Sequence, residues 1–176
     1  FDIDPDLFIE TIKCPLKVRE YQKKYFFRSM KMGRCCMLAP TGAGKTLITH
    51  LMCEALHRIL LDEEEKVLVL VPRVDLVKQT AKKLRQYGCS YEVGEIYGGQ
   101  EKTQYRVTVS TWQSIFTMPE DWFSGFAGII IDECHTAGGE NVRYIAHCCK
   151  NARFRIGMTG TLKDDILFKH LVQAYL

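Results

Sequence analysis

The residues best suited to chemistry form one loop: Ala39, Pro40, Thr41, Gly42, Ala43, Gly44, Lys45 and Thr46. Apolar runs at 35–38 and 47–52 flank it, so a buried strand should enter the loop and a helix should leave it. Glycines let backbone N–H groups curl around phosphate oxygens, and the helix N-terminus adds partial positive charge. Lys45 can neutralise the β- and γ-phosphates and Thr46 can bind Mg²⁺, which predicts a site for ATP and Mg²⁺. A simple glycine-rich turn is the alternative, and Ala39 stands where this pattern usually has glycine.

A second stretch carries two adjacent acids. The apolar run at 128–131 predicts a strand with Asp132 and Glu133 at its carboxyl end, where ligands bind in open α/β sheets. Asp132 can hold Mg²⁺ through its water shell, and Glu133 can act as a general base or position the attacking water. A helix N-cap would explain Asp132 alone, but buried charges are costly unless they are paired or bound to a metal. The pair therefore predicts hydrolysis of the nucleotide.

Two other polar residues are candidates for the same site. Gln22 precedes the loop by about twenty residues, and its amide can both donate to and accept from the edge of adenine. An exposed helical glutamine is the alternative. His135 lies two residues past Glu133, where it can couple the nucleotide site to Thr159 or Thr161 or serve only the structure.

The elements that must position these residues alternate along the chain. Strands are expected at 35–38, 66–71, 91–97, 106–110, 128–131 and 154–158, and helices at 4–12, 18–30, 47–61, 74–87, 141–149 and 164–176. Continuous apolar strands such as 66–71 are typical of parallel sheets that are buried on both faces. The sequence predicts an α/β fold with a doubly wound, mainly parallel sheet flanked by helices, as one domain over residues 1–176.

Bulk composition agrees with a globular domain, since 47% of residues are hydrophobic and 26% are charged. The net charge of +3 permits a nucleic-acid partner without requiring one. None of the eight cysteines forms a C-x-x-C pair, and adjacent cysteines point apart, so free thiols in a reducing cytosol are expected. No apolar run is long enough for a membrane span, and the N-terminus lacks a signal-peptide pattern. The start at Phe1 suggests a piece of a longer protein.

Together these stretches resemble the first motor domain of superfamily 2 helicases and translocases, which implies a RecA-like P-loop NTPase fold. The ATP loop matches motif I, and Asp132-Glu133-Cys134-His135 matches motif II in its DECH form. The stretch 19–22 is similar to the adenine-reading Gln motif, which implies that Arg19 joins Gln22 there. The coupling motif III corresponds to Thr159, Gly160 and Thr161, with Gly160 in place of the usual alanine. Segments 109–113, 122–124 and 132–135 resemble the UvsW-type DNA helicases of T-even phages.

The resemblance also implies a track for one nucleic-acid strand. Its candidate residues are Pro72, Arg73, Lys78, Gln79, Gly98, Gly99, Thr111, Trp112 and Gln113. Basic and amide side chains suit phosphates, and glycines allow close approach of the backbone. Trp112 can stack on a base or, alternatively, pack beneath the loop. A strand gripped by its phosphates would be bound with little sequence preference and strong salt dependence.

The leading prediction is an ATP-dependent DNA helicase or translocase of recombination, repair or replication restart, in the cytoplasm of the host if phage-encoded. DNA is favoured over RNA as the partner, and no membrane is involved. The family's second RecA-like domain, with its arginine fingers, is expected as a further partner; without such an arginine, turnover drops by about 10³-fold or more. These residues alone should therefore bind nucleotide weakly and hydrolyse it slowly. An RNA helicase, a restriction-system motor and a non-catalytic ATP switch are the alternatives, although Glu133 argues against the switch.

Overall fold

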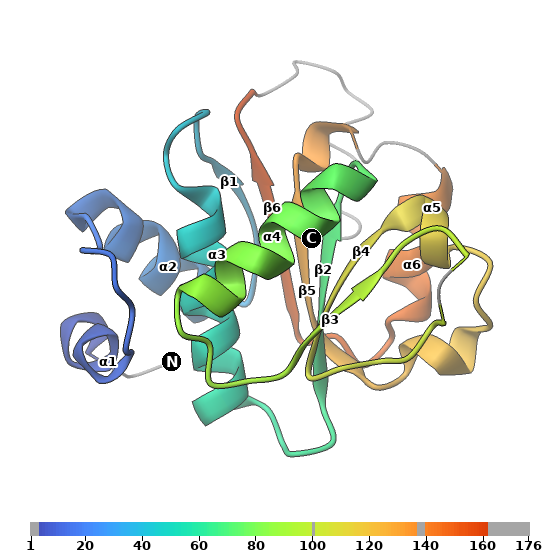
Figure 1. Ribbon diagram of the computed structural model, residues 1–176, viewed down its shortest axis with the longest axis horizontal. Helices are drawn as coiled ribbons and strands as arrows, with labels where there is room; N and C mark the ends of the chain where they lie inside the picture. The colour runs from blue at the N-terminus through green and yellow to red at the C-terminus, as the bar shows by residue number, and fades with distance from the viewer. Residues whose placement is uncertain (1–3, 100, 137–139, 162–176) are drawn as a thin grey trace.

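A sheet of six parallel strands, in the order β1-β6-β5-β2-β4-β3, runs through the described part of the chain (Figure 1). The computed structural model describes residues 4–99, 101–136 and 140–161. The strands are β1 Arg34–Leu38, β2 Lys66–Val71, β3 Val93–Ile96, β4 Val107–Thr111, β5 Phe126–Asp132 and β6 Phe154–Thr159. The predicted doubly wound, parallel α/β fold is thus confirmed, while the helix expected at 164–176 lies outside the described residues.

Helices run between most successive strands, because a parallel pair needs a long crossover connection. The helices before β1 are α1 Pro5–Thr11 and α2 Glu20–Met32, and those between strands are α3 Lys45–Ala55, α4 Val74–Gln86, α5 Trp112–Ile115 and α6 Glu140–Cys148. The helix expected to continue to residue 61 changes after α3 into a π-helical turn, Leu56–Leu60. Short 3-10 helices cover Glu120–Phe123 and Cys134–Thr136. Within the described ranges, no helix has the length and apolar content that crossing a lipid bilayer would need.

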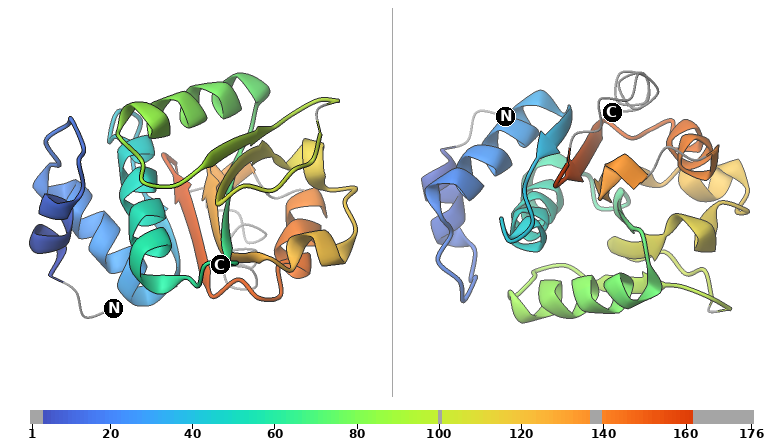
Figure 2. Two further views of the ribbon diagram at one scale, coloured as in Figure 1. Left: turned by 60° about the horizontal axis from the view of Figure 1, so that its bottom comes forward. Right: turned by 90° about the horizontal axis from the view of Figure 1, so that it is seen from above.

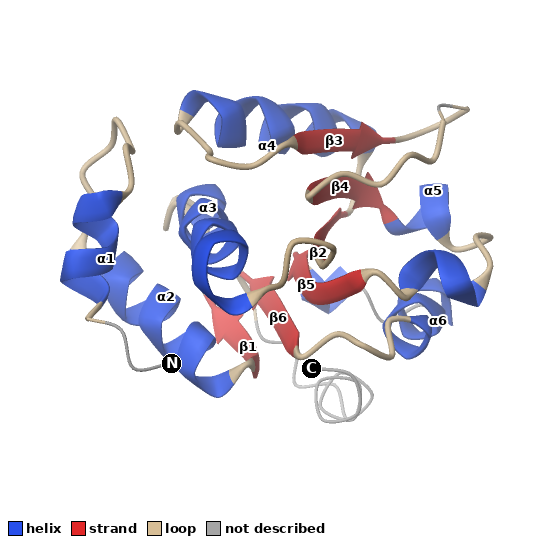
Figure 3. Ribbon diagram, turned by 90° about the horizontal axis from the view of Figure 1, so that it is seen from below, coloured by secondary structure: helices blue, strands red, loops and turns tan. Residues whose placement is uncertain are grey.

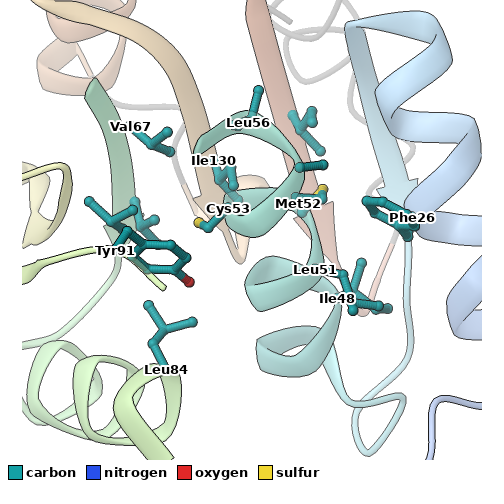
Figure 4. Close-up of a cluster of buried hydrophobic side chains, with 14 of the residues drawn as sticks. Phe26, Ile48, Leu51, Met52, Cys53, Leu56, Val67, Leu84, Tyr91 and Ile130 are labelled. Carbon is teal, nitrogen blue, oxygen red and sulfur yellow. The ribbon is translucent and has the colours of Figure 1, made fainter. Parts of the chain in front are cut away.

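Side chains of the central strands alternate between two hydrophobic clusters, one on each face of the sheet. In β2, Val67 and Val69 join the cluster under α2, α3 and α4, whereas Leu68 and Leu70 join the cluster under α5 and α6. Figure 3 shows these two sets of helices on opposite sides of the sheet. In the first cluster, Phe26 and Leu84 lie on either side of α3 (Figure 4). Burial on both faces explains why β2 is continuously apolar.

The carboxyl ends of the parallel strands share one edge of the sheet (Figure 2). Strand β6 lies between β1 and β5, so the segments that leave these three strands are neighbours. The segments that leave β2, β4 and β3 follow along the same edge. Ligands of open α/β sheets bind at this edge. Here one half of the edge is formed by the ends of β1, β6 and β5, and the other half by the ends of β2, β4 and β3.

Candidate nucleotide site and adjoining groove

The phosphate-binding loop adopts a backbone that its glycines permit. Gly42 and Gly44 have φ angles of 84° and 77°, in the left-handed region that favours glycine. Gly44 directly precedes α3, and its carbonyl accepts hydrogen bonds from the amides of Leu47 and Ile48. Lys45 and Thr46 therefore open the helix, and the positive end of α3 faces the loop.

Lys45 meets both predicted acids in space, although they lie almost 90 positions away in the sequence. Its Nζ donates a hydrogen bond to Glu133 Oε1 and lies 3.6 Å from Asp132 Oδ1. Asp132 is the last residue of β5, and burial raises the pKa of its carboxyl, an effect that the positive charge of Lys45 opposes. The loop follows β1 and the acids lie at the end of β5. Because only β6 lies between these two strands, the loop and the acids are close together.

The backbone at Glu133 is unusual. Its φ of 50° is a positive value on a residue with a side chain, and its amide donates to Asp132 Oδ1 at 3.0 Å. Non-glycine residues rarely adopt this conformation, and such residues cluster at functional sites. The turn directs the Glu133 carboxylate toward Lys45 and, through Oε2, to within 3.3 Å of His135 Nδ1.

His135 connects this turn to the end of β6. Its Nδ1 lies 2.7 Å from Thr159 Oγ1, which also accepts a hydrogen bond of 3.2 Å from the Thr161 amide. Gly160 passes close to the phosphate loop, since a Cβ built on it would lie 3.6 Å from the Thr41 amide nitrogen. The DECH turn, the Thr-Gly-Thr segment and the phosphate loop are therefore in mutual contact, as the coupling hypothesis requires.

The amide of Gln22 is bonded within the protein. Its Oε1 accepts from the Arg19 backbone amide at 2.9 Å, and its Nε2 donates to the Ala43 carbonyl at 3.0 Å. The Tyr21 hydroxyl donates to the same carbonyl, and Arg19 Nη1 donates to Tyr21. Gln22 is 5% exposed, so in this conformation it fixes α2 to the phosphate loop. Adenine reading by Gln22 and Arg19 stays a prediction.

The side chains at the loop fit a Mg²⁺ ion that is shared with nucleotide phosphates. Magnesium is usually held by one or two carboxylates together with phosphates and water. Asp132 supplies a partly exposed carboxylate that already attracts the Lys45 cation, and Thr46 supplies a hydroxyl in the first turn of α3. Within the described ranges, no group of three or more His, Cys, Asp and Glu side chains could hold a metal by itself. A Mg²⁺ ion bound by Thr46 and Asp132 would therefore need further ligands from phosphates and water.

A groove of about 660 Å³ adjoins the nucleotide site at the other half of the same sheet edge. It is lined by the predicted residues Pro72, Arg73, Gly98, Thr111 and Gln113, together with Val74, Lys102, Ser114 and Thr117. These segments leave β2, β3 and β4, which are adjacent in the sheet. An exposed cation, Arg73, and a half-buried one, Lys102, thus meet hydroxyl, amide and backbone groups in one open depression.

Four predicted contacts lie outside the groove lining. Lys78 and Gln79 are exposed on α4, and Lys78 Nζ lies over the Tyr97 ring, 4.9 Å from its centroid. Gly99 is exposed beside the groove. Trp112 is 9% exposed and packs in the cluster under α5 and α6, so its side chain serves the core. This burial agrees with the packing interpretation of Trp112, and base stacking has no support from this conformation.

The sequence predictions missed Lys102 as a candidate for the groove. Its side chain donates to the Gly98 carbonyl at 3.0 Å, and its own carbonyl accepts from Trp122 Nε1 at 3.0 Å. Both contacts join segments that the sequence does not identify as neighbours. The one available signal was a lysine four residues after Gly98, which is weak by itself.

Fold and site together define a RecA-like motor domain of the superfamily 2 helicase class. The chain belongs to the family described as "Type III restriction enzyme, res subunit", whose pattern matches residues 15–164. This membership confirms the resemblance seen in motifs I and II.

The proteins that resemble this chain include two curated relatives and a solved structure. The ATP-dependent DNA helicase uvsW of Enterobacteria phage T4 is 34% identical over 151 residues, which are 82% of this chain and 30% of the relative. The DNA 3'-5' translocase XPB2 of Sulfurisphaera tokodaii is 30% identical over 154 residues, 88% of this chain and 33% of the relative. A crystal structure of T4 UvsW superposes with a TM-score of 0.85 at 28% identity, covering 98% of this chain and 37% of that one. The chain thus spans about a third of the length of these curated relatives.

Proposed function

We propose that residues 1–176 form the ATP-binding motor domain of an ATP-dependent DNA helicase or translocase. The observation that carries the proposal is the cluster in which Lys45 meets Asp132 and Glu133 at the carboxyl edge of the sheet. A cation, a metal-binding carboxylate and a potential base at the start of a helix are the groups that phosphoryl transfer to water needs. In the whole protein, a second RecA-like domain would supply the arginine that stabilises the transition state.

The residues of the cluster have separate roles in this proposal. The phosphates of ATP would draw Lys45 away from Glu133, since a polyanion competes for the ammonium group. The freed Glu133 carboxylate would then accept the proton of the attacking water. A bound Mg²⁺, held by Thr46 and Asp132, would neutralise phosphate charge. A movement of Glu133 would shift His135 and, through the 2.7 Å contact of His135 Nδ1 with Thr159 Oγ1, would also shift the end of β6.

The groove supports nucleic acid as the partner of this site. Arg73 and Lys102 provide positive charge, while hydroxyl, amide and backbone groups can meet phosphate oxygens. Both curated relatives named above carry DNA in their names, which favours DNA over RNA. We infer that one strand lies along the groove and is held by its backbone. The protein would act in DNA recombination or repair in the cytoplasm, which is the host cytoplasm if the protein is phage-encoded.

The test is ATP turnover by the purified chain, alone and with single-stranded DNA, branched DNA or RNA. Glu133→Gln should lower turnover by about 10²-fold or more while ATP still binds in a calorimetric titration. Glu120→Gln, which alters a surface carboxylate paired with Lys150, is the matched control and should behave like the wild type.

Each outcome of this experiment has a distinct meaning. Slow turnover that DNA accelerates, most strongly in branched form, supports a DNA motor. Acceleration by RNA alone would reassign the protein to RNA remodelling. Binding of ATP with no turnover under any condition would favour an ATP-binding switch. Rapid unwinding by these residues alone would contradict the role given to a second domain.

A further inference from the structure

Two thiols from distant parts of the sequence meet beside the nucleotide site. Cys36 lies on β1 and Cys134 directly follows Glu133, and their Sγ atoms are 3.4 Å apart. Strand β6 separates β1 from β5, so a contact between these two residues must cross it. The residue of β6 that pairs with Cys36 is Gly157, which in turn pairs with Ile131 of β5. Because Gly157 has no side chain, β6 places no side chain directly beside Cys36, which leaves room for its contact with Cys134.

The surroundings of the two sulfurs favour a bond between them. Cys134 belongs to the cluster under α5 and α6, and Cys36 packs against that cluster, so the thiols lie on the same face of the sheet. A disulfide needs its sulfurs about 2.0 Å apart, so they must approach by roughly 1.4 Å. Rotation about the Cα–Cβ bonds of two small side chains can supply much of that movement. Cys36 is half-buried, whereas Cys134 is 5% exposed, which leaves Cys36 as the thiol that a small oxidant reaches first.

We propose that Cys36 and Cys134 form a reversible disulfide under peroxide and that this bond inhibits the ATP site. The effect on turnover rests on the proposed function, whereas formation of the bond does not.

The reaction balances with hydrogen peroxide as the oxidant. The Cys36 thiolate attacks one peroxide oxygen and the O–O bond breaks, which gives a sulfenic acid and hydroxide. The Cys134 sulfur then attacks the Cys36 sulfur, the S–O bond breaks and water leaves. Two thiols lose two electrons and two protons in total, and one peroxide becomes two waters. A dithiol such as dithiothreitol reverses the change by thiol–disulfide exchange.

The position of the bond explains why it would inhibit the site. Cys134 lies between Glu133, whose backbone is already in a rare conformation, and His135, which contacts Thr159. Cys36 lies on the strand that leads into the phosphate loop. A covalent tie would pull the DECH turn toward β1 and hinder the release of Glu133 from Lys45. Displacement of a catalytic group by about 1 Å can cost up to about 10²-fold in rate, so turnover should fall by tenfold or more while ATP still binds.

Cys35 provides a matched control. It is adjacent to Cys36 and also half-buried, but it packs against the cluster on the opposite face of the sheet. Trypsin leaves Cys35 and Cys36 together in the peptide 35–45, and it leaves Cys134 as the one cysteine of the peptide 107–143. The Cys35→Ser variant therefore assigns a cross-link between these peptides to Cys36 without ambiguity.

The experiment treats the folded chain with hydrogen peroxide, blocks the remaining thiols, and digests it without reductant for mass spectrometry. The wild type and Cys35→Ser should give a linked pair of peptides 35–45 and 107–143, whereas Cys36→Ser and Cys134→Ala should not. ATP turnover measured in parallel should fall in the first two proteins, recover with dithiothreitol, and resist peroxide in the last two.

Two outcomes would overturn the proposal. The first is a folded wild type whose Cys36 becomes sulfenic or sulfinic acid with no linked peptide. The second is a linked peptide with unchanged turnover, which would show that the disulfide forms but does not inhibit the ATP site. A chain with no ATP turnover at all would fail the proposed function alone, because the linked peptide is detected without ATP.

Discussion

At the scale of single residues, Gly44 lets the phosphate loop lie directly against α2. A Cβ built on Gly44 would lie 2.4 Å from Gln22 Nε2, and its φ of 77° strains any residue with a side chain. We predict that Gly44→Ala lowers both the free energy of unfolding and the affinity for ATP. The left-handed backbone alone costs about 1–2 kcal/mol, and the overlap would also push Gln22 away from the Ala43 carbonyl. Urea unfolding and titration with a fluorescent ATP analogue measure the two effects.

Gly42 is the matched control for this substitution. Its φ is 84°, and nothing lies within 4 Å of the Cβ position, so Gly42→Ala adds backbone strain without overlap. Gly44→Ala should therefore lower the free energy of unfolding more than Gly42→Ala does. In a Gln22→Ala background the two substitutions should cost about the same. Equal costs in the wild-type background would show that the Gln22 contact does not matter.

At the scale of elements, one hydroxyl joins the end of β5 to the end of β6. Thr159 is fully buried, and its Oγ1 contacts His135 Nδ1 and the Thr161 backbone. We predict that Thr159→Val, which keeps the shape but removes the hydroxyl, leaves ATP binding near the wild-type value. It should reduce nucleic-acid-stimulated turnover more than basal turnover, since the path from Glu133 to the Thr-Gly-Thr segment is broken. Turnover with and without DNA measures the ratio.

Thr108→Val separates this effect from a general loss of stability. Thr108 is also fully buried, and its Oγ1 accepts from the Tyr105 amide and donates to the Tyr105 carbonyl, away from the site. Each substitution leaves hydrogen-bond partners of a buried hydroxyl unsatisfied, which costs about 1–3 kcal/mol. If Thr108→Val reduces the stimulation of turnover by nucleic acid as much as Thr159→Val does, Thr159 acts only through its effect on stability.

Strands and helices could be predicted from the sequence, but the order of the strands could not. Apolar runs bounded by Gly, Pro and polar residues locate the elements, because periodicity reports which faces are buried. The insertion of β6 between β1 and β5 depends on helix packing across the whole sheet, which no local pattern contains. The contact of Cys36 with Cys134 depends on this strand order and on the glycine that β6 places beside Cys36, so it has no sequence signal.

Some features of the candidate site could likewise be predicted from the sequence and others could not. We could predict Lys45, Asp132 and Glu133 from the sequence, because charges next to buried apolar strands are costly unless they are paired or bind a ligand. Binding of phosphates and Mg²⁺ accounts for all three charges. The hydrogen bonds of the Gln22 side chain to Ala43 and Arg19 could not be predicted, because their partners are backbone groups, which almost every residue has. The change from helix α3 to a π-helical turn at Leu56 also left no trace in the apolar periodicity.

At the scale of the whole molecule, a buried histidine makes stability depend on pH. His50 is fully buried, its Nδ1 lies 3.3 Å from the Tyr91 hydroxyl, and within the described structure its Nε2 has no hydrogen-bond partner. Burial lowers the pKa of His50 below the usual 6.5, while Glu54 opposes and Arg58 assists the shift. The unfolded chain therefore takes up the proton first, so stability is greatest above pH 6.5 and is lost as the pH falls.

Urea unfolding at pH values between about 7.5 and 5.5 checks this prediction, since one proton contributes at most about 1.4 kcal/mol per pH unit. His50→Gln should flatten the profile in part. The pKa of His57 is also lowered, chiefly by burial, so some dependence should remain. His147→Gln alters an exposed histidine and should leave the slope unchanged. A profile that His50→Gln does not alter would assign the pH dependence elsewhere.

The divided edge of the sheet predicts that nucleic-acid affinity and nucleotide affinity can be altered separately. Lys102 lines the groove that β2, β3 and β4 form, whereas Lys45 lies at the half formed by β1, β6 and β5. Lys102→Gln removes the charge and keeps an amide that can still donate to the Gly98 carbonyl. It should weaken binding of single-stranded DNA and reduce the slope of log affinity against log salt by about 0.7, the contribution of one phosphate. Its affinity for ATP should stay at the wild-type value.

Fluorescence anisotropy of a labelled oligonucleotide over a range of salt concentrations measures that slope. Lys150→Gln is the matched control, because Lys150 pairs with Glu120 and lies just before β6 begins, at the opposite edge of the sheet from the groove. Its slope should equal that of the wild type, since no phosphate contact is lost there. If Lys102→Gln and Lys150→Gln reduce the slope equally, the attraction arises from net charge alone and the groove does not hold the strand.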